Sequence, residues 1–158
     1  MVSFQTSKRF FSTVSALSLL LLLPTASGRT ETTPTGIRVE MDPQKLTLRV
    51  ALWSGNDARV AVYKNRLPWG SAYSMILVAV TSSGQYVRKE LPVDDPSPEQ
   101  VSLDPKELIK GEIDLRKVFR GLDGVLKKSD VHLFWAYAAP EELHIAQAGG
   151  WIFIPQVH

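Results

Sequence analysis

Residues 46–53 are Leu-Thr-Leu-Arg-Val-Ala-Leu-Trp, and this stretch decides the fold. Apolar side chains occupy every second position, with mostly polar residues between them. A period of two predicts a β-strand that buries one face. The same alternation occurs just upstream at Ile37, Val39 and Met41, and Asp42-Pro43 lies between the two segments as a bend. The folded part of the chain is therefore expected to begin with two strands.

Further short strands are predicted at regular intervals downstream. Residues 54–57, Ser-Gly-Asn-Asp, are a strong turn signal, so the 46–53 strand is expected to form a hairpin with a strand containing Val60 and Val62. Residues 75–80 are six apolar residues without alternation, which predicts a strand covered on both faces. The other predicted strands are a charge-protected edge at 85–91, a strand bent at Gly111 over 108–115, a central strand at 131–137 and a last strand at 151–154.

One short helix is expected among these strands. Asp114 is a candidate N-cap for residues 115–126, where apolar residues recur at helical spacing, and Gly121 and Gly124 limit the helix to about two turns. Strands that do not alternate with helices predict an all-β fold, an antiparallel β-sandwich of seven or eight strands with this one helix. A small closed barrel is the alternative, because periodicity alone does not separate the two architectures.

The order of these segments resembles the immunoglobulin-like sandwich domains of exported bacterial proteins. The resemblance is carried by the leucines of 46–53, Asn56-Asp57, Val60 with Val62, Leu67-Pro68 and the aromatic strand 131–137, and it covers about residues 37–154. The pattern is also similar in outline to a group of bacterial proteinase inhibitors built on that sandwich. The resemblance implies a fold only. The immunoglobulin cysteines are missing, and no family site residue can be transferred.

The N-terminal segment is predicted to be a secretory signal peptide spanning residues 1–28. Lys8 and Arg9 form a basic start, residues 14–23 are an apolar block of about ten residues, and Ala26-Ser27-Gly28 offers small residues for cleavage. A bilayer-spanning helix would need about 20 apolar residues, so no stable membrane span is expected after cleavage. Residues 29–36 are expected to be a flexible leader, followed by a single domain at 37–155. The protein is accordingly predicted to be exported, either periplasmic or secreted.

The composition of the remaining 130 residues narrows the classes of partner. Lys8 and Arg9 leave with the predicted leader, so 16 basic residues face 16 acidic ones and the mature chain is formally neutral. No basic face suited to phosphate remains, which argues against a nucleic-acid partner. Cysteine is absent, so neither disulfides nor a lipid-modified cysteine is available, and stability must come from apolar burial.

The residues for catalysis are difficult to assemble from this chain. There is no cysteine nucleophile, no glycine-framed serine and no glycine-rich phosphate loop after a strand, so no nucleotide cofactor is expected. His132 lies in the central strand, and Glu141 with His144 lacks the further ligands that a zinc site needs. We therefore expect a non-enzymatic protein without catalytic residues, metal or cofactor. A hydrolase with dispersed carboxylates remains a minor alternative.

Aromatic residues next to turns are the remaining candidates for binding. Trp53 ends a strand on its outward side, and Trp69 and Tyr73 flank a small-residue loop that begins with Pro68. Large rings anchor protein interfaces and stack on sugars, although they also close the ends of cores. The leading hypothesis is a domain that binds a protein or glycan partner outside the cytoplasm. The alternatives are a proteinase inhibitor that presents the loop 67–70 or 93–98, and a carbohydrate-binding module that uses Trp53, Trp69 and Tyr73.

Overall fold

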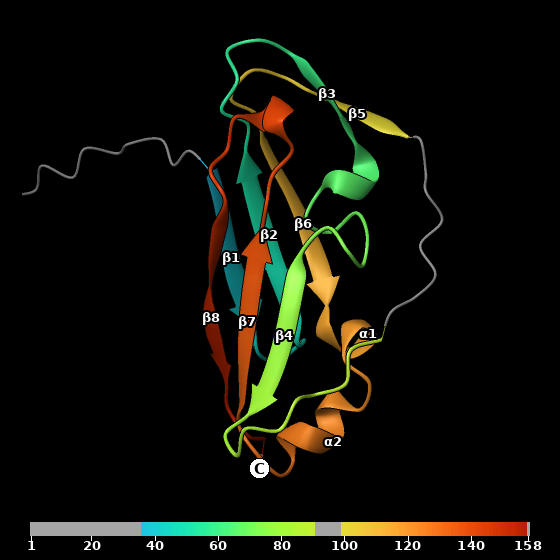
Figure 1. Cartoon of the computed structure of the whole chain (residues 1–158), viewed down its shortest axis with the longest axis vertical. Helices are drawn as coiled ribbons and strands as arrows, with labels where there is room; N and C mark the ends of the chain where they lie inside the picture. The colour runs from blue at the N-terminus through green and yellow to red at the C-terminus, as the bar shows by residue number, and fades with distance from the viewer. Residues whose placement is uncertain (1–35, 91–98, 158) are drawn as a thin grey trace, which may run out of the picture. The chain divides into compact units, whose positions relative to one another are not determined.

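The computed structural model describes residues 36–90 and 99–157 (Figure 1), and these residues belong to one compact unit. The predicted signal peptide, residues 29–35 of the predicted leader and the proline-rich loop 92–98 lie outside the described residues. Gly36, the last residue of that leader, begins the first strand. Among the described residues, none of the helices combines the length and the apolar character needed to cross a bilayer.

One three-stranded antiparallel sheet contains the segment that decides the fold. It has the order β1-β2-β6, with β1 at Gly36–Asp42, β2 at Thr47–Trp53 and β6 at Leu108–Asp114. The predicted alternation is confirmed in β2, where the side chains of Leu48, Val50 and Leu52 are at most 1 % exposed. Because β-strand side chains alternate between faces, these three define the inner face of the sheet.

A second three-stranded antiparallel sheet has the order β4-β7-β8. Its strands are β4 at Ile76–Thr81, β7 at Val131–Tyr137 and β8 at Ala148–Ile154. The predicted central position of 131–137 is confirmed, since β7 pairs with β4 on one side and with β8 on the other. The sheet lies face to face with the first in Figure 1.

The core lies between the two sheets. Inward-facing residues of β2 and β7 belong to a single buried cluster, and each fully buried leucine or valine contributes about 1.5–3 kcal/mol to folding. No ladder joins the two sheets within the described chain, so the strands do not close into the alternative barrel. The prediction of an all-β, antiparallel fold is confirmed. Side chains at most 1 % exposed from these two strands include Leu48, Val50, Leu52, Val131, Leu133 and Tyr137.

The predicted hairpin between 46–53 and Val60–Val62 is wrong. The strand β3 at Val60–Tyr63 pairs instead with β5 at Gln100–Leu103, a strand that the sequence pattern did not predict. Residues 54–57 do not form a tight turn because they dock on a distant segment. The Gly55 N–H donates to the Leu143 carbonyl at 3.0 Å, and the buried Asn56 side-chain amide donates to the Glu142 carbonyl.

Two short α-helices replace the single predicted helix, α1 at Leu115–Val118 and α2 at Leu122–Leu126. Asp114 caps α1 as expected, since its carboxylate accepts a hydrogen bond from the Arg116 N–H at 3.0 Å. Gly121, with a φ of 71°, separates the helices, because a left-handed residue cannot continue a right-handed helix. Two 3-10 turns, η1 at Lys64–Arg66 and η2 at Glu141–Leu143, complete the described elements.

Four further expectations about strands are corrected. Strand β4 is not covered on both faces, since its residues alternate and Ile76 is 58 % exposed. The described residues 85–90 form only two isolated bridges, Tyr86 with Val80 of β4 and Lys89 with Phe119, instead of a continuous ladder. Strand β6 runs through Gly111 in regular register with β2, without a bulge, and β8 includes Gly149 and Gly150 instead of following them.

Candidate functional site

The most unusual surface of the protein is the outward-facing side of the β4-β7-β8 sheet. Register places its side chains in three rungs, each with one residue from every strand. Seven of the nine are hydrocarbon or glycine, and the other two are His132 and Trp151, whose rings carry nitrogen; we call this surface the apolar face. The rungs are Ile76, Ala136 and Gly149; Val78, Phe134 and Trp151; and Val80, His132 and Phe153.

The large side chains of β8 on the apolar face are much more exposed than core side chains. Trp151 is 66 % exposed and Phe153 is 56 % exposed, both on β8. The rings contact one another in pairs: the Phe134 and Trp151 centroids are 5.2 Å apart, and those of His132 and Phe153 are 5.4 Å apart. Tyr86, which bridges to Val80, extends the third rung with a ring that is 79 % exposed.

The outward-facing side of the other sheet has the opposite chemistry. Arg38 pairs with Glu40, and the Arg49 guanidinium pairs with Asp42 at 2.6 Å and with Glu112 at 3.7 Å. Alternating charges of this kind are typical of a sheet face that stands in water. The two outer sheet faces therefore differ: the β1-β2-β6 face carries ion pairs, and the β4-β7-β8 face carries mainly apolar side chains.

The apolar face contains several large side chains that are more than half exposed, Ile76, Trp151 and Phe153. Monomeric soluble proteins rarely expose large contiguous apolar patches, and such patches mark interaction sites. An antiparallel sheet with one solvated face normally carries polar residues there. Residues 76–80 of β4 and 151–154 of β8 are apolar on both phases, with one phase in the core and the other on the apolar face.

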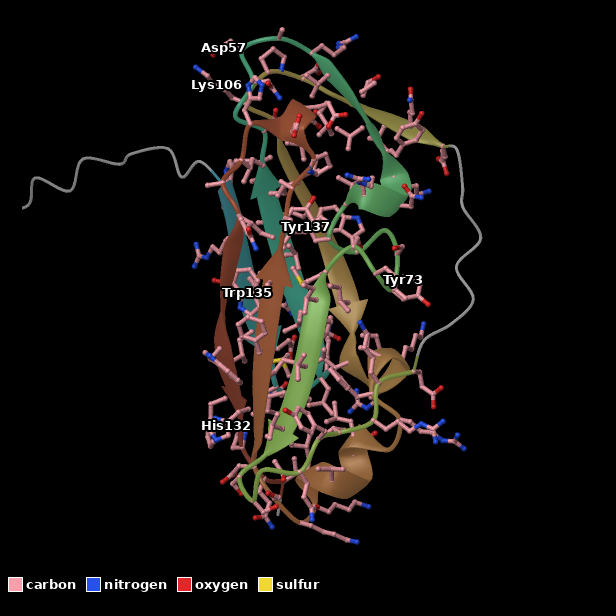
Figure 2. The ribbon with its side chains drawn as sticks, in the orientation of Figure 1. Asp57, Tyr73, Lys106, His132, Trp135 and Tyr137 are labelled. Carbon is pink, nitrogen blue, oxygen red and sulfur yellow. The ribbon has the colours of Figure 1, made fainter. Side chains whose placement is uncertain are left out.

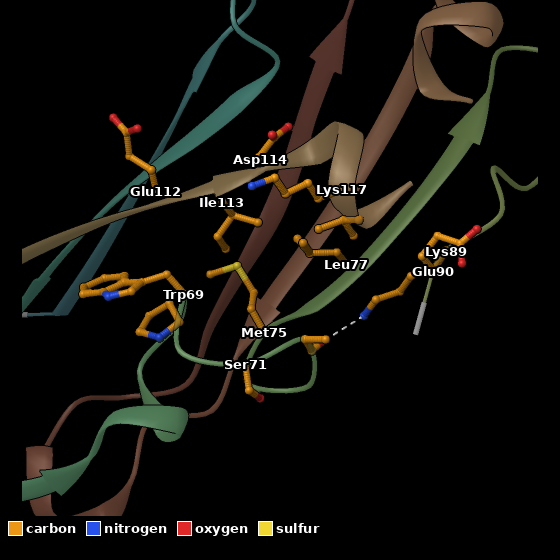
Figure 3. Close-up of a pocket in the computed structure, with 13 residues that line it drawn as sticks. Trp69, Ser71, Met75, Leu77, Lys89, Glu90, Glu112, Ile113, Asp114 and Lys117 are labelled. Atoms are coloured by element: carbon orange, nitrogen blue, oxygen red, sulfur yellow. Dashed lines mark hydrogen bonds between the residues drawn. The ribbon is translucent and has the colours of Figure 1, made fainter. Parts of the chain in front are cut away.

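A cleft lies between β4 and β6, on the far side of β4 from the apolar face (Figure 3). Its volume is about 370 Å³, and its apolar lining includes Trp69, Met75 and Ile113. Trp69 is half-buried there because Gly111 leaves room for its ring: a Cβ at residue 111 would lie 2.0 Å from the indole. Trp69 therefore closes the open side of the core.

The rim of this cleft carries charges of both signs. Glu90, Glu112 and Asp114 contribute carboxylates, and Lys89 and Lys117 contribute ammonium groups. The Lys89 Nζ donates a hydrogen bond to the Ala72 carbonyl at 3.1 Å, the dashed line in Figure 3. Partial burial lowers the pKa of Lys89 below its ordinary value of 10.5. Mixed charge around an apolar floor gives no selectivity for one sign of ligand.

The four predicted binding residues are not brought into one site. Pro68 and Trp69 line the cleft, with Pro68 buried. Trp53 ends β2 opposite Leu108, on the charged side of the other sheet. Tyr73, 58 % exposed, stands on the loop beside β4 in a shallow depression that also contains Ile76 (Figure 2). Trp69 and Tyr73 therefore line two different depressions, and neither of these contains Trp53.

Sequence reasoning missed the apolar face because it predicted that residues 75–80, which contain β4, are covered on both faces. The signal was nevertheless present in β8, where Trp151 and Phe153 share one phase and Ile152 and Ile154 share the other. When an edge strand is apolar on both phases, only one phase faces the core, and the side chains of the other phase are exposed. Only the register shows that Phe134 and Val78 lie beside Trp151 on that phase.

The described residues hold no group of three or more His, Cys, Asp or Glu side chains that could bind a metal ion. His132 belongs to the apolar face, and His144 follows η2 with a φ of 50°. Comparison of the sequence with protein-family models and with curated proteins gives no match. The function must therefore be argued from the geometry of this chain alone.

Proposed function

We propose that this protein is an exported, non-enzymatic domain that binds another protein through the apolar face. The observation that carries the proposal is the three-rung array of Val78, Phe134, Trp151 and their neighbours, exposed beside a second sheet whose outer face is charged. Burial of such a surface against a partner supplies about 25 cal/mol per Å² of apolar area. Aromatic residues are enriched at the centres of protein interfaces, and Phe134 occupies the middle rung of the central strand of this face.

A protein partner fits this surface better than a glycan does. Sugar sites combine stacking rings with several hydrogen-bond partners for hydroxyl groups, whereas the nine residues of the apolar face offer only the His132 imidazole and the Trp151 indole N–H. Ile76, Val78 and Val80 form one whole edge of the face and can contact only hydrocarbon. The carbohydrate-binding alternative based on Trp53, Trp69 and Tyr73 loses support, because those rings lie in separate surroundings.

The proteinase-inhibitor alternative has no protruding loop to support it among the described residues. Leu67 is 4 % exposed and Pro68 is buried, and the Leu67 carbonyl accepts a hydrogen bond from Gly70 at 2.8 Å. A loop that inserts into an active cleft has to present its side chains to solvent. The second candidate loop, 93–98, lies outside the described residues.

The immunoglobulin-like assignment belongs to the same proposal. Strand order supports it: one sheet has the order β1-β2-β6, and the other has the order β4-β7-β8. Immunoglobulin-like sandwiches divide their strands in this way, with strands A, B and E in one sheet and C, F and G in the other. The additional β3-β5 pair lies outside that scheme. The proposed signal peptide at 1–28 supports export to a compartment where such domains bind partners.

The proposal is tested by placing a photo-crosslinking amino acid at Ile76, on the apolar face, in the protein expressed by its own cell. A matched protein carries the crosslinker at Lys110, on the charged face of the other sheet. We expect illumination to give a discrete adduct with a different protein from position 76 and none from position 110. Residue 76 lies on β4, about 10 Å across the sheet from β8. A crosslink from this position therefore does not report contacts made by the outer edge of β8.

Two results would overturn the proposal. Equal adducts from positions 76 and 110 would show collision and not binding, and no adduct from either position would leave the apolar face without a protein partner. Oligosaccharide titration adds a further arm, because the exposed Trp151 reports ligand stacking by fluorescence. A saturable shift that is lost in Trp151→Ala would replace the protein partner with a glycan.

A further inference from the structure

Strand β8 is the longest uncharged edge strand of the described chain, with seven residues; β3 and β5 are also uncharged but have only four residues each. Strands β1 and β6 carry charged residues, including Arg38 and Glu112, and charges at an edge discourage pairing with another strand. The outer edge of β4 is covered over residues 79–81, because the Thr81 N–H donates to the Gln85 carbonyl and the Val87 N–H donates to the Ala79 carbonyl. Strand β8, Ala-Gly-Gly-Trp-Ile-Phe-Ile, has no charged residue at all.

The edge of β8 also has no partner within the described chain. Its residues form a ladder with β7, and no other hydrogen bond of residues 148–154 occurs among the described residues. Figure 1 shows β8 at the margin of its sheet. A seven-residue strand of apolar residues with a free row of N–H and C=O groups is a template for a further strand.

The sequence of β8 is complementary in size to itself. Its first three residues, Ala148, Gly149 and Gly150, are small, and its last three, residues 152–154, are Ile, Phe and Ile. An antiparallel copy of the strand places one copy's small residues opposite the other's large ones. The pairs are Ala148 with Ile154, Gly149 with Phe153 and Gly150 with Ile152, and Trp151 lies opposite itself on a two-fold axis.

This is the only symmetric register in which all seven residues of β8 pair with residues of the second copy. An antiparallel partner must keep residues of one face opposite residues of the same face, so symmetric registers shift in steps that shorten the overlap. Gly149 is also unable to carry a side chain readily, since a Cβ there would lie 2.9 Å from the Trp135 carbonyl. The shallow rung formed by Ala136 and Gly149 therefore leaves space beside the edge for the ring of an incoming Phe153.

From this edge we infer that the protein forms a two-fold dimer in which β8 pairs antiparallel with β8 of a second copy. The two β4-β7-β8 sheets become one continuous six-stranded sheet. Main-chain hydrogen bonds provide the pairing, and the apolar faces of both copies end on the same side. The inference goes beyond the proposed function, because it concerns the edge of the sheet and identifies the occupant as the same chain.

The absence of native cysteine makes the register directly measurable. Opposed residues of an antiparallel pair have Cα atoms about 4.5–5.5 Å apart, within the range of about 4.4–6.8 Å that a disulfide spans. Trp151→Cys should therefore form a disulfide-linked dimer under mild oxidation. Phe153→Cys should not, because residue 153 lies about 13 Å along the strand from its counterpart. Glu40→Cys, exposed on the charged face, is the control for random collision.

The same experiment includes a measurement without cysteine. The purified protein should sediment as a dimer, and Trp151→Lys, which places two like charges opposite each other, should weaken dimerisation about tenfold or more. Circular dichroism should be unchanged, since residue 151 is exposed. A protein that stays monomeric at every concentration overturns the inference, as does crosslinking of Phe153→Cys or Glu40→Cys at the rate of Trp151→Cys.

The two proposals can fail separately. A dimer crosslinked through residue 151, with no foreign adduct at residue 76, would retain the dimer and reject the protein-binding function. A foreign adduct at residue 76 from a strictly monomeric protein would retain the function and reject the dimer. The mass of the adduct, twice that of the chain or not, identifies which of these holds.

Discussion

The indole ring of Trp69 packs directly on Gly111, where a Cβ would come within 2.0 Å of the ring. Trp69 and Gly111 therefore close the core together where it opens between β4 and β6. Trp69 was a candidate for a binding residue in the sequence, and its ring is half-buried against the core cluster. The glycine in β6 is a recess for this ring and not a bend in the strand.

Gly111→Ala should lower the free energy of unfolding by about 1–3 kcal/mol, because the added methyl group has to displace the Trp69 ring or the strand. Urea unfolding gives the value. Gly124→Ala is the matched control, since a Cβ in that helical position meets nothing within 4 Å. The control should be neutral or more stable by up to about 1 kcal/mol. Equal destabilisation of both variants would contradict the assigned contact.

Tyr137 should make stability fall at high pH. Its hydroxyl donates to the Arg66 carbonyl at 2.9 Å, and burial raises the pKa of Tyr137 to about 12, above its ordinary value of 10.0. The folded state therefore retains the proton more strongly than the unfolded state. The resulting stability is complete below pH 10 and is lost as the pH rises from about 10 through 12.

Tyr137→Phe supplies the comparison for that pH dependence. The variant should lose about 1 kcal/mol near neutral pH through the missing hydrogen bond. Its stability should then fall less steeply than the wild type above pH 10. Parallel curves for the two proteins in urea unfolding between pH 8 and 12 would show that another group is responsible.

Asn56 should be necessary for the docking of residues 54–57 on η2. Its buried side-chain amide donates to the Glu142 carbonyl and to the Ser54 hydroxyl, the latter at 3.3 Å. Asn56→Ala leaves that carbonyl without this donor and should cost about 1–3 kcal/mol. The neighbouring Asp57→Ala removes only an exposed ion pair with Lys106 (Figure 2) and should stay within about 0.5 kcal/mol. Similar losses in thermal unfolding of the two variants would rule out the docking role.

The apolar face should bind an environment-sensitive dye such as ANS in the native state, because the dye reports exposed apolar surface. Ile76→Lys and Phe153→Lys should each reduce the fluorescence without loss of stability, since both side chains are more than half exposed. Leu108→Lys, an exposed apolar residue at the end of β6, is the control and should retain the signal. Retention of the full signal in the two face variants would place the dye elsewhere.

Local sequence rules correctly predicted the elements that are determined by residues close together in the sequence. The alternation of 46–53 gave β2 and its buried face, and Asp114 was predicted correctly as the cap of α1. The same rules failed for 54–57, because Asn56 and Gly55 bond to residues almost 90 positions away. Strand β5 was missed since four residues with one well-buried side chain, Leu103, carry little periodic signal.

The sequence by itself determined an all-β fold and the inward phase of its best strands, because alternation and turn chemistry act between near neighbours. It also determined the small-to-large order along β8. Tertiary structure alone decided which strands pair, that Trp69 fills the recess at Gly111, and that Val78, Phe134 and Trp151 share one exposed rung. The reason is that a strand's second face is defined by the register with its neighbours, and register joins residues that no local pattern connects.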